Sequence, residues 1–123
     1  AVMIKKGLAK ELILGNLDSY RDWGHSKDYV RAMHLILSHN VPDDFVIATG
    51  ETSSVREMCQ IVFNKLGLNY QDYVRQDQRF MRPEELPYLK GDSSKARSVL
   101  GWQPEFTIET LLEEMIEHYL GVL

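Results

Sequence analysis

The sequence is poor in cysteine, in excess positive charge and in long apolar stretches. Its only cysteine is Cys59, so no disulfide can form within the chain, and we expect a reducing compartment such as the cytoplasm. The formal net charge of −4 argues against nucleic acid as a partner, because such binding needs a concentrated basic surface. No apolar run approaches the roughly 20 residues that span a bilayer, so we expect no membrane partner either.

Clusters of metal ligands and an obvious nucleophile are also missing. The histidines, His25, His34, His39 and His118, fall in no close metal-ligand spacing, and none stands beside Cys59. Cys59 falls on the apolar face of an expected helix, where a small buried hydrophobe is the simplest role. We therefore predict neither a metal site nor cysteine chemistry.

The apolar residues that are present predict an α/β unit. Hydrophobic residues make up 44% of the 123 positions, which is enough for one modest core, so we expect residues 1–123 to form a single unit. The patterning predicts helices over 2–12, 26–39, 55–66, 94–100 and 108–120, and strands over 11–16, 45–49 and 70–76.

Two of these segments carry an expectation about burial. The helix over 26–39 has apolar residues on adjoining faces, which predicts that it is well buried. Residues 45–49 form a continuous apolar run that ends at Gly50, and this is typical of a strand covered on both faces in a parallel sheet.

Helix ends are marked by short polar signals. Ser54, followed three residues later by Glu57, predicts a capping box at the start of a helix. Thr107 is expected to cap the final helix, and Gly101 to end the helix before it. The glutamate row along the final helix is most simply a solvated face.

Two arginine motifs lie about sixty residues apart, Arg21-Asp22-Trp23-Gly24-His25 and Arg82-Pro83-Glu84-Glu85. A guanidinium presents a rigid fork of donors that matches paired phosphate oxygens. The carboxylate of Glu85 can accept hydrogen bonds from two neighbouring ribose hydroxyls. Either motif alone can equally be a solvated ion pair or the start of an extended loop. Together they suggest a clamp for a nucleotide diphosphate.

The motifs stand in a recognisable context, which includes Leu14-Gly15-Asn16-Leu17-Asp18, Ser54-Val55-Arg56-Glu57, Gly91-Asp92 and Leu100-Gly101-Trp102. With them, nearly the whole chain resembles the C-terminal part of GDP-mannose 4,6-dehydratases, which belong to the extended short-chain dehydrogenases/reductases. The resemblance implies an α/β fold, namely the C-terminal substrate-binding part of an extended Rossmann-type dehydratase, with a few short strands and about four to five helices.

The resemblance also implies a substrate site. Arg21 and Arg82 match the two arginines that contact the diphosphate of the nucleotide sugar, and Glu85 matches the acid that holds the ribose hydroxyls. Asn16 falls near the place of the base. The neighbouring Asp22, Trp23, His25 and Asp28 are expected to be scaffold residues that fix the loop and begin the next helix.

The catalytic apparatus of the resembling family is not in this sequence. That family carries a glycine-rich dinucleotide loop and a Tyr-x-x-x-Lys pair in an N-terminal dinucleotide-binding domain, which we take to be absent here. None of the six tyrosines is followed four residues later by lysine. We therefore expect no catalytic residue and no cofactor in this chain, whereas the full-length family uses NADP to oxidise C4, eliminate water across C5 and C6 and return the hydride to C6.

Three functions stay open. The first is the nucleotide-sugar-binding part of a GDP-mannose 4,6-dehydratase, not catalytic alone. The second is a stand-alone accessory or binding module. The third is a structural remnant that forms homo-oligomers, because the strand over 45–49 needs neighbours on both edges. Met81 stands where the family usually has an aromatic residue, so GDP-mannose and related nucleotide sugars both remain candidate ligands.

Overall fold

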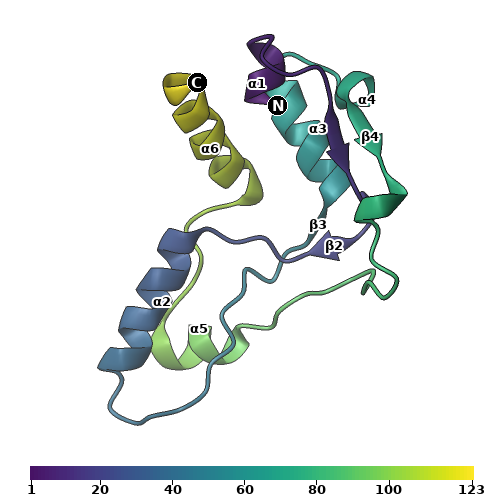
Figure 1. The fold of residues 1–123 in the computed structure, drawn as a ribbon. Helices are drawn as coiled ribbons and strands as arrows, with labels where there is room; N and C mark the ends of the chain where they lie inside the picture. The colour runs from purple at the N-terminus through teal and green to yellow at the C-terminus, as the bar shows by residue number, and fades with distance from the viewer.

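The computed structural model describes residues 1–123 and arranges them in two parts joined by a small sheet (Figure 1). One part holds most of the helices and the strands β1 and β4, and the other holds α2 and α5. The elements in chain order are α1 (Val2–Lys5), β1 (Leu12–Leu14), β2 (Tyr20–Arg21), α2 (Ser26–Ser38), β3 (Ser53–Ser54), α3 (Val55–Lys65), α4 (Tyr70–Tyr73), β4 (Val74–Gln76), the 3₁₀-helix η1 (Gln78–Phe80), α5 (Ser94–Leu100) and α6 (Ile108–Val122). This arrangement confirms the predicted α/β class.

The strands form two separate pairs. β1 and β4 are parallel, with Leu12 opposite Val74. β2 and β3 are antiparallel, with Tyr20 opposite Ser54. The prediction of a strand over 70–76 was only partly right, because residues 70–73 form the helical turn α4 before the strand begins.

The predicted helix ends are confirmed by their hydrogen bonds. Ser54 Oγ accepts from the Glu57 backbone N–H at 3.1 Å, and the Glu57 carboxylate accepts from the Ser54 N–H at 2.7 Å, which completes the capping box of α3. Thr107 accepts from the Thr110 N–H at the start of α6. α5 ends at Gly101, whose φ of +66° lies in the left-handed region that glycine adopts without strain.

The core consists of small clusters of buried side chains. Cys59 and Phe63 of α3 pack with Ile4, Leu17 and Val74, so α3 holds α1 and β4 together. Burial raises the pKa of the Cys59 thiol, in keeping with the predicted apolar role. In the other part of the molecule, a second cluster of Ala32, Ala96 and the fully buried Trp102 packs α2 against α5.

The predicted parallel strand over 45–49 is wrong for this chain. The segment is not in any sheet, and the backbone of residues 45–48 makes no hydrogen bond. Phe45 and Ile47 pack against the Trp102 cluster, whereas Val46 is exposed. One face is covered as expected, but a strand also needs a neighbouring strand, and no segment of this chain supplies one.

Two helix predictions also need correction. α2 is not well buried, because only Asp28 and Ala32 are buried and Val30, Met33 and Leu37 are exposed. No element of this chain covers that second apolar face. The helix predicted over 2–12 ends at Lys5, before residues 6–8 turn towards β1.

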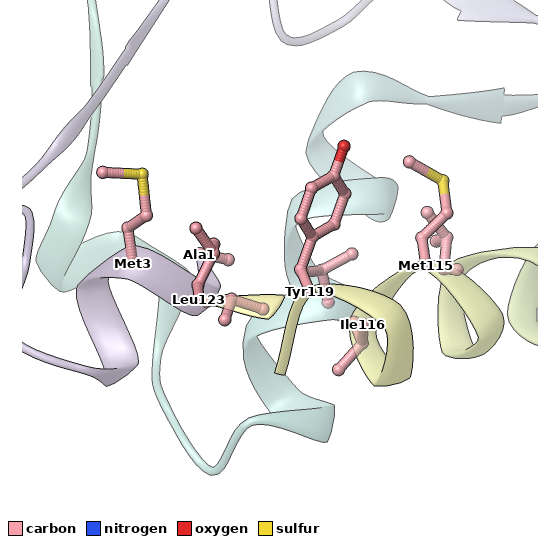
Figure 2. Close-up of a pocket in the computed structure, with 9 residues that line it drawn as sticks. Ala1, Met3, Met115, Ile116, Tyr119 and Leu123 are labelled. Atoms are coloured by element: carbon pink, nitrogen blue, oxygen red, sulfur yellow. The ribbon is translucent and has the colours of Figure 1, made fainter. Parts of the chain in front are cut away.

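An apolar groove of about 270 Å³ lies between α1, α3 and α6 (Figure 2). Met3, Met115 and Tyr119 rise from its walls, and Ala1 and Leu123 both line it, so the two ends of the chain meet there (Figures 1 and 2).

Candidate functional site

Three of the four predicted site residues meet in the structure. Asn16 follows β1, Arg21 lies in β2 and Glu85 lies in the loop of residues 81–90. Asn16 Nδ2 donates to Glu85 Oε2 at 3.1 Å, and Arg21 Nη2 lies 3.5 Å from Glu85 Oε1. The Glu85 carboxylate is therefore held between an amide and a guanidinium that come from a distant part of the sequence.

Backbone hydrogen bonds bring the loop 81–90 to this position. The Tyr20 N–H donates to Pro87 O at 2.9 Å, and the Leu89 N–H donates to Tyr20 O at 3.1 Å. The loop therefore runs along β2 on the side that β3 does not occupy. Gly15 allows a similar approach near η1, because a Cβ at this position would overlap the Phe80 carbonyl group.

Arg21 has one side of its guanidinium fixed and another side open. Nη1 donates to Tyr20 O and to Leu86 O, both at 2.7 Å. Nε makes no hydrogen bond, and the side chain is about a quarter exposed. The Nε donor therefore has no partner within the protein, and a free guanidinium donor of this kind can contact an anion.

Arg82 is exposed and makes no hydrogen bond or ion pair with the protein. It lies in the same loop as Glu85, so any shift of the loop also moves Arg82. The predicted convergence of Arg21 and Arg82 on one diphosphate stays a prediction.

Asn16 has all its amide donors engaged within the protein. Nδ2 donates to Ser19 Oγ at 2.7 Å as well as to Glu85, and Oδ1 accepts from the Asp18 N–H at 2.9 Å. Ser19 is only 2% exposed, so the amide is fixed to a buried residue. The Asn16 amide therefore has no free N–H donor, and the expected position of Asn16 near the base stays a prediction.

Asp22 joins three segments, as expected of a scaffold residue. Its carboxylate accepts from the Thr49 N–H and hydroxyl at 2.9 and 2.6 Å, from the Gly50 N–H at 2.9 Å and from the Gly91 N–H at 3.3 Å. Burial raises the pKa of Asp22, but these hydrogen bonds outweigh burial and hold the pKa below its ordinary value. Asp22 thus ties the segment before β3 to the segment that precedes α5.

Asp28 is the second buried scaffold carboxylate. It is 1% exposed, and it accepts from the Glu105 and Phe106 N–H groups at 3.0 and 3.1 Å and from Arg31 at 3.2 Å. Its backbone carbonyl accepts from Trp102 Nε1 at 2.9 Å. The start of α2 is therefore tied to the segment between α5 and α6.

The other two scaffold residues also have structural contacts. Trp23 Nε1 donates to Ser53 O at 3.0 Å, which fixes the loop after β2 to β3. His25 Nδ1 accepts from the Lys27 N–H at 3.0 Å, so His25 caps α2, and its ring stacks on Phe106 with 4.0 Å between ring centres. His25 is thus a structural residue, as predicted.

A polar cavity of about 560 Å³ near the Asp22 junction was missed by sequence reasoning. It is lined by Thr49, Gly50, Glu51, Lys90, Gly91, Asp92, Ser93, Ser94 and Arg97. Arg97 spans it by donating to Thr49 O at 3.0 Å and to Ser93 Oγ at 3.3 Å. The only signal of this cavity in the sequence was the polar run at 91–95.

Other kinds of site find no support in this chain. No group of three or more His, Cys, Asp or Glu side chains is placed to hold a metal ion. No helix has the length and apolar character needed to cross a bilayer.

Solved structures share this fold. RMD from Pseudomonas aeruginosa, complexed with NADPH, matches with a TM-score of 0.87 at 24% sequence identity, over 99% of this chain and 40% of that one. UDP-glucose 4-epimerase from Thermotoga maritima, with UDP-glucose, matches with a TM-score of 0.81 at 22% identity, over 98% of this chain and 38% of that one. The chain therefore has the fold of a portion of these proteins.

Sequence comparison identifies the family. The protein-family model described as GDP-mannose 4,6 dehydratase matches residues 1–115 of this chain. The chain is 50% identical over 117 residues to GDP-mannose 4,6 dehydratase 2 of Arabidopsis thaliana, which covers 95% of this chain and 31% of the relative. It is 41% identical over 120 residues to the human GDP-mannose 4,6 dehydratase, over 84% of this chain and 32% of the relative. The chain belongs to the GDP-mannose 4,6 dehydratase family and spans about a third of these relatives' length.

Proposed function

We propose that this chain is the C-terminal, nucleotide-sugar-binding part of a GDP-mannose 4,6-dehydratase. The observation that carries the proposal is the meeting of Asn16, Arg21 and Glu85 at the loop 81–90. Family membership supplies the ligand class, because the relatives are GDP-mannose dehydratases and the epimerase from Thermotoga maritima was solved with UDP-glucose.

Each residue has a role that its contacts support. The open donors of Arg21 and the unpaired guanidinium of Arg82 bind the diphosphate, since charge-assisted hydrogen bonds to phosphate are strong and directional. Glu85 accepts from the ribose hydroxyls. Met81 leaves the base less enclosed than an aromatic residue would, so related nucleotide sugars are weaker ligands of the same site.

The chemical steps belong to other parts of the whole protein. The chain offers no glycine-rich loop and no Tyr-x-x-x-Lys pair, so its residues do not fit a dinucleotide, and NADP binds elsewhere in the full-length enzyme. This chain binds and orients the sugar nucleotide for the dehydratase reaction. The single buried Cys59 supports a cytoplasmic setting.

Calorimetry with GDP-mannose, GDP and UDP, on this chain alone and on the longer protein that contains it, tests the proposal. Arg82→Ala should lower the affinity for GDP-mannose by about ten- to a hundredfold, because one charge-assisted contact to phosphate contributes about 1.5–3 kcal/mol. Arg82 has no protein partner, so its removal leaves the fold intact. Arg79→Ala is the matched control, since Arg79 is exposed in the neighbouring turn and pairs only with Asp77. Equal affinities of the two variants would contradict the assigned role of Arg82.

The same titration separates the remaining alternatives. A stand-alone binding module should bind GDP-mannose without any further domain. A part of a larger enzyme should bind measurably only when the rest of the protein is present. If neither the chain nor the longer protein binds any nucleotide sugar, the proposed function is wrong.

Self-association is a second candidate property, favoured by the segment 45–49. The backbone hydrogen-bonding groups of residues 45–48 are unpaired and Val46 is exposed, so a second copy of this chain can pair with the segment as a strand. Sedimentation velocity should show a homodimer or larger assembly that Val46→Lys disrupts, because a charge on an exposed edge opposes strand pairing. A monomer at about 100 μM, a concentration that reveals contacts with Kd of about 10⁻⁴ M, would contradict this candidate.

A further inference from the structure

We propose that Asn16 is a positioning residue that sets the orientation of Glu85, and that its amide does not donate a hydrogen bond to the ligand. The inference rests on the proposed function, since it assigns Glu85 to the ribose of a nucleotide sugar. It differs from the sequence-based expectation, which placed Asn16 at the base.

The first argument is that both N–H donors of the Asn16 amide are used within the protein. Both of its N–H donors are used, one on Ser19 Oγ at 2.7 Å and one on Glu85 Oε2 at 3.1 Å, and Oδ1 already accepts from the Asp18 N–H. An amide has only two N–H donors, so Asn16 can donate to a base only by releasing Glu85 or Ser19.

The second argument is that Asn16 connects buried residues to Glu85 in the loop 81–90. Ser19 is 2% exposed and Leu17 is 3% exposed, so the residues on either side of Asp18 are fixed in the interior. The Glu85 side chain is 24% exposed. Asn16 thus links a rigid, buried turn to a carboxylate at the surface, and it restricts the rotamers that Glu85 can adopt.

The third argument is the number of acceptor positions left on Glu85. Each carboxylate oxygen can accept two hydrogen bonds. Asn16 occupies one position on Oε2, and Arg21 approaches Oε1 at 3.5 Å. One position on each oxygen stays open, and this pair of acceptors matches the two neighbouring hydroxyls of a ribose.

Asn16→Asp tests the inference, because it replaces the donor that faces Glu85 with a second carboxylate. Two carboxylates at hydrogen-bonding distance repel each other, so Glu85 should turn away. At pH 7.5 we expect the affinity for GDP-mannose to fall by at least about tenfold. The Tyr20 and Leu89 amides, which hold the loop, should exchange hydrogen at least about tenfold faster. Asn40→Asp is the matched control, since it makes the same chemical change at an exposed position after α2.

The double variant N16D/E85Q separates positioning from a general loss of structure. The glutamine amide can donate to the introduced carboxylate, which restores the pair with its polarity reversed. Protection of the Tyr20 and Leu89 amides should then return to the level of E85Q alone. In calorimetry, N16D should weaken GDP-mannose binding in the parent but not in the E85Q background.

These readouts keep the two proposals distinguishable. If neither this chain nor the longer protein binds a nucleotide sugar, the proposed function fails, and the amide exchange still decides whether Asn16 positions Glu85. Unchanged exchange in N16D would overturn the inference. Faster exchange in N16D that E85Q does not restore would overturn it as well, because Asn16 would then act on something other than Glu85.

Discussion

Replacement of Asp28 by asparagine is the most direct test of how the two parts of the molecule are held together. Asp28 lies at the start of α2, and its carboxylate accepts two backbone N–H groups from residues 105 and 106 as well as a hydrogen bond from Arg31. An asparagine side chain has nearly the same shape, so the change in stability reports on hydrogen bonding and charge, with little contribution from packing.

The expected loss in the free energy of unfolding follows from the hydrogen-bond partners of Asp28. If the asparagine oxygen takes the place of Oδ1, it keeps the Glu105 N–H, and its NH₂ group then faces the Phe106 N–H. A buried N–H without an acceptor costs about 1–3 kcal/mol, and a neutral acceptor for Arg31 is weaker than a carboxylate by about 1 kcal/mol. We expect Asp28→Asn to lower the free energy of unfolding by about 2–4 kcal/mol.

Urea denaturation followed by tryptophan fluorescence measures this change. Trp102 is fully buried and donates to the Asp28 carbonyl, so its emission reports on the same junction. Asp18→Asn is the control, because Asp18 is exposed and its ion pair with Arg56 lies in solvent, where such pairs contribute little to stability. A loss below about 0.5 kcal/mol for Asp28→Asn, at an unchanged m-value, would refute the view that this carboxylate joins the two parts.

Three further changes have definite expected outcomes. The hydrogen bonds to Asp22 hold its folded pKa below the unfolded value of about 3.9, so its contribution to stability is present above about pH 4 and lost as the pH falls further. Asp22→Asn should therefore cost about 2 kcal/mol at pH 7 and progressively less below pH 4, as measured by urea denaturation over a pH series. Gly15→Ala should cost about 1–3 kcal/mol in the same assay and weaken GDP-mannose binding, because the added methyl group displaces the Phe80 carbonyl. Ser54→Ala should cost about 1 kcal/mol through loss of the α3 capping box, as measured by thermal unfolding.

Each of these predictions has a result that contradicts it. Asp22→Asn with the same destabilisation at pH 3 as at pH 7 would show that the charge of Asp22 is not involved. Gly121→Ala is the control for Gly15→Ala, because a Cβ there meets nothing within 4 Å; equal effects would argue against the clash. Glu57→Gln, which can still accept from the Ser54 N–H, should retain more stability than Ser54→Ala.

Sequence reasoning succeeded where the determinants are local. The Ser54 capping box, the Thr107 cap and the left-handed Gly101 each depend on residues within one turn. A short window of sequence contains all the atoms that form these features, so their positions followed directly from the residue types.

It failed where burial depends on partners that this chain does not contain. The apolar residues of α2 and of residues 45–49 were read as buried, yet Leu37 is 84% exposed and residues 45–48 have no neighbouring strand. The hydrophobic pattern indicates that other residues must pack against an apolar face, but it does not identify the segment that does so. The predictions therefore identified the apolar residues correctly but were wrong about how far these residues are buried in this chain.

The candidate site was predictable as a set of residues, but its contacts were not. The family resemblance selected Asn16, Arg21, Arg82 and Glu85, and the structure places Asn16 and Arg21 in contact with Glu85 but gives Arg82 no contact with them. The saturated amide of Asn16 depends on Ser19 and on a loop that is distant in sequence. Such geometry appears only after the chain has folded. The polar cavity spanned by Arg97 was missed for the same reason.

The meeting of Ala1 and Leu123 at one apolar groove has a practical consequence for protein engineering. A short Gly/Ser linker can join the two residues, and new ends can be opened in the exposed segment 40–44, which gives a circular permutant. Affinity tags on this permutant would project from the far side of the molecule. A tag on the original ends would instead start at the groove and cover its apolar side chains.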